Sequence, residues 1–139
     1  MSQSLEERVI QLISLVENRK FVEAIQHFYA DDAVMRENGG TQRTGLEAIL
    51  AGERRALASF KEMHVSRAAS FIVDGDRAAI NWIFEYTDVG GRRRRLNEIA
   101  YQQWRDGRIV HECFYYDPAQ RLAEVEPTHD PAAAPVVAA

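Results

Sequence analysis

The stretch NEIAYQQWRDGRIVHECFYYDP, residues 97–118, decides the fold, because two runs of alternating side chains flank the turn signal RDG at 105–107. Such a pattern is typical of an antiparallel hairpin. The loop length decides which side chains share a face, since a slip of one residue exchanges the two faces. A two-residue turn pairs Trp104 with Ile109, whereas a three-residue loop pairs Trp104 with Arg108.

We favour the three-residue loop, because it places two carboxylates against an apolar wall. Under this loop Ala100 faces Glu112 and Glu98 faces Phe114. The predicted inner row is then Leu96, Glu98, Ala100 and Gln102 on one strand and Val110, Glu112, Phe114 and Tyr116 on the other. The other turn remains possible on composition alone.

The hairpin is the end of a longer β-rich half that begins after Met63. Turn signals at 74–76 and 88–91 separate further runs and predict an antiparallel meander. In AINWIFEY, residues 79–86, alternation places the aromatic side chains on the inner face together with Ile80; they are Trp82, Phe84 and Tyr86. The arginine run 92–95 alternates between the two faces, which favours a solvated hairpin end over a nucleic-acid site.

The first half is helical by its apolar periodicity. Ser4 and Glu7 have capping-box spacing before a helix that ends near Asn18. A second helix covers 21–29, and the turn at 30–32 should end it before a short strand at 33–36. A glycine loop follows, and a second capping box, Thr44 with Glu47, should open a third helix that reaches residue 60. We therefore predict an α+β fold, with three helices on one face of a curved antiparallel sheet.

Length and composition bound the remaining possibilities. The chain has 139 residues, which suits one domain, 1–126, and the Pro/Ala-rich tail 127–139 is expected to be disordered. The N-terminus lacks a signal peptide and no run is long enough to span a bilayer, so a cytoplasmic protein without membrane contact is expected. The net charge of −4 disfavours nucleic acid as a partner. The four histidines and the single Cys113 show no metal-ligand spacing, so neither a metal nor a cofactor is expected.

The order of these segments resembles the nuclear transport factor 2-like superfamily, in particular its SnoaL-like and ketosteroid isomerase-like members. The resemblance rests on FYADDAVMRENGG, on the helix start TGLEAI and on WRDGRIVHECFYYD, and covers residues 5–118. It implies a cone-shaped fold with a cavity between helices and sheet, and a homodimer formed through the sheet's outer face. The superfamily includes isomerases, hydrolases, cyclases and binding proteins without catalysis.

The resemblance transfers catalytic roles only in part. It implies that Glu37 matches the general base of ketosteroid isomerases, a carboxylate shortly after the Ala-Asp-Asp-Ala stretch. The two oxyanion donors of those enzymes correspond to Ile13 and Ala100, which cannot donate. The catalytic set of the family's epoxide hydrolases corresponds to Glu98, Ala100 and Phe114, and is not reproduced.

Three carboxylates, Glu37, Glu98 and Glu112, are the candidate catalytic residues, because a carboxyl group in apolar surroundings gains a raised pKa suited to acid and base work. Alternatively they lie solvated at the cavity mouth or pair with arginines. The candidate ligand-binding residues are Trp82, Phe84, Tyr86, His64, Gln102, Phe114 and Tyr116. The alternative for each of these residues is a structural role, in the core, in the pocket wall or, for His64, as an isolated histidine.

The predicted function is the binding of a small, apolar or amphipathic molecule, with possible general acid/base catalysis of an isomerase, hydrolase or cyclase type. Glu37 or Glu112 would act as base, and Tyr116 or His64 as polarising donor. A binding protein without catalysis and a dimeric interaction domain are the two alternatives.

Overall fold

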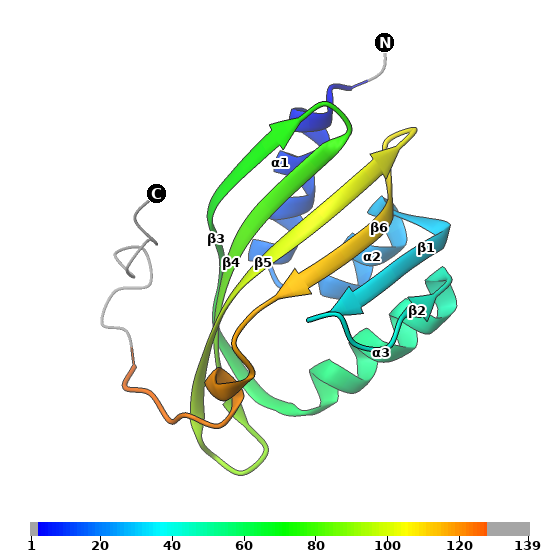
Figure 1. Cartoon of the computed structure of the whole chain (residues 1–139). Helices are drawn as coiled ribbons and strands as arrows, with labels where there is room; N and C mark the ends of the chain where they lie inside the picture. The colour runs from blue at the N-terminus through cyan, green and yellow to red at the C-terminus, as the bar shows by residue number, and fades with distance from the viewer. Residues whose placement is uncertain (1–2, 128–139) are drawn as a thin grey trace.

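The protein is described by a computed structural model over residues 3–127, in which three helices pack on one face of a six-stranded sheet (Figure 1). The helices are α1 (Leu5–Glu17), α2 (Phe21–Phe28) and α3 (Leu46–Ala58). The strands are β1 (Tyr29–Glu37), β2 (Arg43–Thr44), β3 (Phe60–Asp74), β4 (Arg77–Asp88), β5 (Arg93–Arg105) and β6 (Arg108–Tyr115). The curved sheet runs in the order β2-β1-β6-β5-β4-β3 and stays open, so the predicted α+β fold is confirmed.

Strands β3 to β6 form the predicted antiparallel meander, with turns at the three predicted positions. One pairing differs from an all-antiparallel sheet, because β1 lies parallel to β6. Most of the chain separates these two strands, so no hairpin constrains their relative direction. Strand β1 thereby joins the helical half of the chain to the free edge of the meander.

The last hairpin has the two-residue turn, so the preference for the three-residue loop was wrong. Asp106 and Gly107 have φ angles of 53° and 75°, as a type I′ turn requires, and Trp104 pairs with Ile109. A bulge then adds one residue to β6, so that Gln102 pairs with Glu112 and Ala100 pairs with Phe114. A bulge reverses the alternation. From Glu112 onward, the β6 residues predicted to face inward therefore do face inward. Before the bulge the prediction fails, because Ile109 and not Val110 fills the core.

The start of the chain follows the prediction as far as α2. Ser4 caps α1, its side chain accepting a hydrogen bond from the Glu7 amide. Tyr29 is not helical but opens β1, and the pair Asp31-Asp32 lies in that strand instead of forming a turn. The second predicted capping box does not form. Gly45, with a φ angle of 95°, precedes α3, and no side chain caps this helix. Tyr29 pairs with Ile109 of β6, and Thr44 pairs with Val34 of β1, so strand pairing overrides these local signals.

The hairpin end at 92–95 is more buried than predicted. Arg93 and Arg95 both contact the carboxylate of Glu85, which is fully buried on the outer face of β4, at 3.3 and 3.2 Å. Arg94 pairs with Asp88 across the turn at 3.1 Å. The arginine run thus anchors the β4–β5 hairpin.

After β6 the chain continues through a 3-10 helix, η1 (Pro118–Arg121), beside the free part of β5. The Gln120 side chain accepts from the Asn97 amide and donates to the Asn97 carbonyl, and the Val125 amide donates to the Arg93 carbonyl. Most of the predicted tail, 127–139, lies outside the described residues. Among the described residues, no helix is long and apolar enough to cross a membrane.

Candidate functional site

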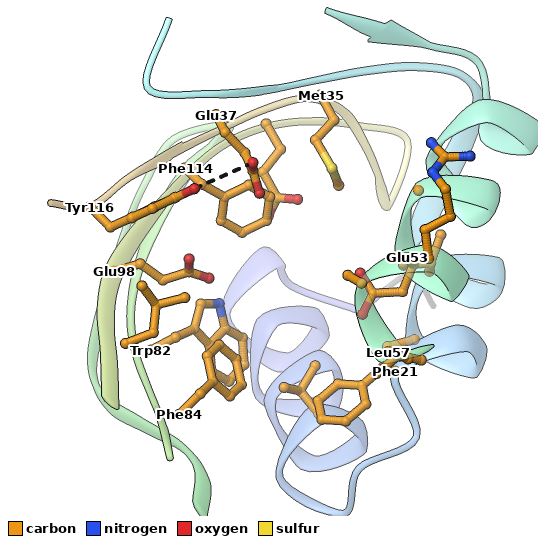
Figure 2. A pocket seen from close by; sticks show the side chains of 18 of the residues that line it. Phe21, Met35, Glu37, Glu53, Leu57, Trp82, Phe84, Glu98, Phe114 and Tyr116 are labelled. Atoms are coloured by element: carbon orange, nitrogen blue, oxygen red, sulfur yellow. Dashed lines mark hydrogen bonds between the residues drawn. The ribbon is translucent and has the colours of Figure 1, made fainter. Parts of the chain in front are cut away.

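A cavity of about 570 Å³ lies between the three helices and the inner face of the sheet (Figure 2). Its volume is in the range of small-molecule sites. Aromatic and aliphatic side chains form one end, among them Phe21 of α2, Leu57 of α3, and Trp82 and Phe84 of β4, which stack with ring centroids 5.9 Å apart. Carboxyl groups line the other end, so the pocket is apolar at one end and polar at the other.

Glu98 projects from β5 into this cavity beside Trp82 (Figure 2). The residue is only 8% exposed, and no side chain or amide of residues 3–127 donates a hydrogen bond to its carboxyl group. Burial, together with the charges of Glu112 and Glu37, raises the pKa of Glu98 to about 8. At neutral pH this carboxyl group is therefore mainly protonated and can donate a proton or a hydrogen bond to a ligand.

Glu112, on β6, is held in a network that occupies both of its oxygens. The Tyr29 hydroxyl donates to one oxygen, and the Gln102 amide donates to the other at 2.6 Å. The indole of Trp104 can only donate, and its bond to the Gln102 carbonyl oxygen at 3.0 Å fixes the orientation of the amide. Burial raises the pKa of Glu112 to about 7, although the two hydrogen bonds oppose that rise.

Glu37, at the end of β1, lies at the cavity mouth. Its side chain is 39% exposed and lies 3.9 Å from the Arg121 guanidinium, and the Tyr116 hydroxyl donates to it at 3.5 Å (Figure 2). Arg121 also stacks over the Tyr116 ring, 4.9 Å from its centroid, and donates to its hydroxyl. The segment after β6 therefore forms part of the mouth.

The wall of the cavity on the side of α3 carries polar residues that sequence reasoning missed. Glu53 points into the cavity from α3, opposite Glu98 (Figure 2), and burial raises its pKa. A signal was available, because Glu53 lies four residues from both Ile49 and Leu57, on the apolar stripe of the helix. Arg43 of β2 lines the same wall, and nothing in the local sequence marked it.

The structure brings most of the predicted site residues to this cavity. The three carboxylates line it, as do Trp82, Phe84, Tyr86, Gln102, Phe114 and Tyr116. His64 does not line it, contrary to the prediction, because its ring bonds to Thr87 of β4 at 2.7 Å. Within residues 3–127, no three His, Cys, Asp or Glu side chains are grouped to hold a metal ion.

Comparison with known proteins agrees with this geometry. Residues 9–112 match the SnoaL-like domain family. The chain belongs to the SnoaL-like family. This family lies within the nuclear transport factor 2-like superfamily, so the predicted resemblance is confirmed. No curated protein matches the chain.

Solved structures share the fold at low sequence identity. A protein from Mesorhizobium loti, named a SnoaL-like polyketide cyclase, has a TM-score of 0.75 and 23% identity over 82% of this chain and 100% of its own. IdmH from Streptomyces antibioticus, named a polyketide cyclase, has a TM-score of 0.71 and 22% identity over 86% and 96%. TerC, crystallised with polyporic acid, has a TM-score of 0.69 and 18% identity over 81% and 91%. At these identities the likeness establishes the fold alone.

Proposed function

We propose that this SnoaL-like protein binds a small, largely apolar carbonyl compound in the cavity and transfers a proton on it, without a cofactor. The observation that carries the proposal is the Glu98 carboxyl group, which is buried in the cavity wall and has no hydrogen-bond donor of its own among residues 3–127. A buried, protonated carboxyl group is suited to act as a general acid at neutral pH. The stacked rings of Trp82 and Phe84 provide a flat apolar surface for the body of the ligand.

The proposed reaction is enolisation next to a carbonyl group. Glu98 donates its proton to the carbonyl oxygen, where negative charge develops, and becomes a carboxylate. The Glu37 carboxylate accepts the proton from the neighbouring carbon, so the C–H bond breaks and an enol forms. Both carboxyl groups point into the cavity in Figure 2. Glu112, whose oxygens are already occupied, positions the polar wall instead of reacting.

The relatives support this class of ligand. Two of the similar structures are named polyketide cyclases, and a third was crystallised with polyporic acid. Polyketides are rich in carbonyl groups next to acidic C–H bonds, which is the chemistry that a paired acid and base can address. A cyclase or isomerase reaction therefore fits the cavity.

Replacing Glu98 with Gln is expected to lower turnover about 100-fold or more, because an amide can donate a hydrogen bond but cannot deliver a proton. The rate of deuterium exchange at the activated carbon of 2-tetralone, followed by NMR, measures this. Binding of the ketone, followed by tryptophan fluorescence, should change little. Glu47→Gln is the matched control, because Glu47 is an exposed glutamate of α3. Exchange that is no faster than in buffer, with binding intact, would establish a binding protein instead.

The exchange rate is also expected to fall as pH rises above about 8, because Glu98 then loses its proton. A plot of kcat/KM against pH should show this descending limb in the wild-type protein. Glu98→Gln should lack the limb. A limb that persists in the variant would assign the proton donor elsewhere.

We further propose that the outer face of the sheet forms a homodimer. Ile99, Tyr101 and Tyr115 are 41%, 42% and 49% exposed there, and Ile99 pairs directly with Tyr115. Three large exposed side chains on adjacent strands form an apolar patch suited to a second copy. Ile99→Glu is expected to give monomers in sedimentation analysis. A monomeric wild-type protein would contradict the proposal.

A further inference from the structure

Arg43 occupies an unusual place in the wall of the cavity. It lies on the short strand β2, beside Met35 of β1, and its side chain crosses the surface of α3 at Gly52. A Cβ atom at Gly52 would lie 2.9 Å from the Arg43 Nε and 3.0 Å from its Cζ. The glycine therefore makes room for the guanidinium group, and both residues line the cavity.

The guanidinium group of Arg43 is not engaged by the protein. Among residues 3–127 it has no hydrogen bond and no carboxylate oxygen within 4.0 Å. Its nitrogens are not completely buried. By contrast, Arg94 pairs with Asp88 and Arg121 contacts Glu37. Arg43 is half-buried, so its charge is screened less by water than a surface charge would be.

No acidic group of residues 3–127 pairs directly with Arg43, so its hydrogen-bond donors can still take an anion. Glu53 is the acidic neighbour on α3. Burial raises its pKa and the charge of Arg43 opposes that rise, but no Glu53 oxygen lies within 4.0 Å of the guanidinium nitrogens. Glu98 faces the same space from the sheet and is mainly protonated at neutral pH. The cavity thus offers a cation on the helix wall and a neutral proton donor on the sheet wall.

We propose that Arg43 binds an anionic oxygen group of the ligand, so that the ligand is an aromatic or polycyclic carboxylate or enolate. Its apolar body lies against Trp82 and Phe84 and its anionic group against the guanidinium. The planar fork of an arginine matches the two oxygens of a carboxylate. This inference rests on the proposed use of the cavity and adds the ligand's charge to it.

The test compares 2-naphthoate with its methyl ester, which share the ring system and differ in charge. By calorimetry at pH 6.5, wild-type protein is expected to bind the acid roughly 10-fold to 100-fold more tightly, as a charge-assisted hydrogen bond allows. Arg43→Gln should reduce that ratio to about one while affinity for the ester changes little. Arg54→Gln is the matched control, since Arg54 is an exposed arginine of α3 that does not line the cavity.

Gly52→Ala provides a second variant that keeps every charge. The added methyl group must displace the guanidinium, whereas alanine favours a helix more than glycine does, so α3 should remain folded. Acid affinity is expected to fall at least fivefold relative to the ester. An unchanged ratio in Arg43→Gln, an equal loss in Arg54→Gln, or a wild-type protein that does not prefer the acid would overturn the proposal.

The outcome is separable from the test of catalysis. Loss of acid preference in Arg43→Gln, with exchange activity unaffected by Glu98→Gln, would leave the anion site standing and remove the catalytic proposal. The reverse result would keep Glu98 as the acid and assign the ligand no anionic group.

Discussion

Glu98→Gln is expected to resist urea better than the wild-type protein at pH 8.5, by about 4 kcal/mol in the free energy of unfolding. The native state holds the proton of Glu98 up to a pKa of about 8, whereas the unfolded chain releases it near the ordinary value of 4.5. The native state therefore binds more protons between these values, so wild-type stability falls as pH rises from about 4.5 to 8. A shift of this size corresponds to roughly 5 kcal/mol, from which the unpaired amide of the variant subtracts about 1 kcal/mol.

The comparison needs urea titrations at pH 5 and pH 8.5 for both proteins. At pH 5 the carboxyl group is protonated in the native state, so the variant should gain little or nothing. Glu47→Gln should show no pH-dependent gain, because that side chain is exposed. Wild-type stability that stays level, or rises, between these pH values would mean that Glu98 is ionised in the fold and cannot be the proposed acid.

This prediction links stability to function. A carboxyl group that is costly to ionise destabilises the protein at alkaline pH, yet the same cost keeps it protonated at neutral pH. Removing it should give a more stable and less active protein, as is common for groups in active sites. A stability gain without a loss of exchange activity would separate the two roles.

Gln102→Leu is expected to destabilise the protein by about 3 kcal/mol. The leucine fills a similar space but leaves one oxygen of Glu112 and the indole N–H of Trp104 unpaired in the core. Each unpaired buried polar group costs about 1 to 3 kcal/mol. The loss should grow above pH 7, because the ionised Glu112 then has only Tyr29 as a donor.

Urea unfolding at pH 6 and pH 8 measures both the loss and its growth. Gln103→Leu is the matched control, since Gln103 is the next residue of β5 and lies half-buried outside the network. A double-mutant cycle with Trp104→Phe isolates the coupling between Gln102 and Trp104. Equal effects of Gln102→Leu and Gln103→Leu would show that the network adds no stability of its own.

The sheet could be predicted from the sequence to a useful degree. Alternation in residues 79–86 places Trp82, Phe84 and Tyr86 correctly, because side chains on a strand necessarily alternate. The inward direction of Glu98 and Glu112 was also predicted, although the turn between their strands was wrong. The bulge in β6 compensated for that error, and no local sequence pattern predicts this bulge.

The polar part of the site was predicted less completely. Glu53 left a readable signal, a charged residue on the apolar stripe of α3. Tyr29 was assigned to a helix, and its bond to Glu112 joins residues 83 positions apart. Arg43 and Arg121 reach the cavity from a two-residue strand and from the segment after β6, where no periodic pattern exists to place them.

The sequence by itself determined the three helices, the antiparallel meander, their order and the apolar faces that enclose the cavity, because periods of 3.6 and 2 residues are local properties of the backbone. Only the tertiary structure decided which carboxyl group has hydrogen-bond donors and which, among residues 3–127, has none. Glu98 and Glu112 both lie on strands and both point inward. Glu112 accepts hydrogen bonds from Tyr29 and Gln102, which are 83 and 10 positions away along the chain, whereas no donor within residues 3–127 reaches the Glu98 carboxyl group. Hydrogen bonding and burial in three dimensions set the state of a buried acid.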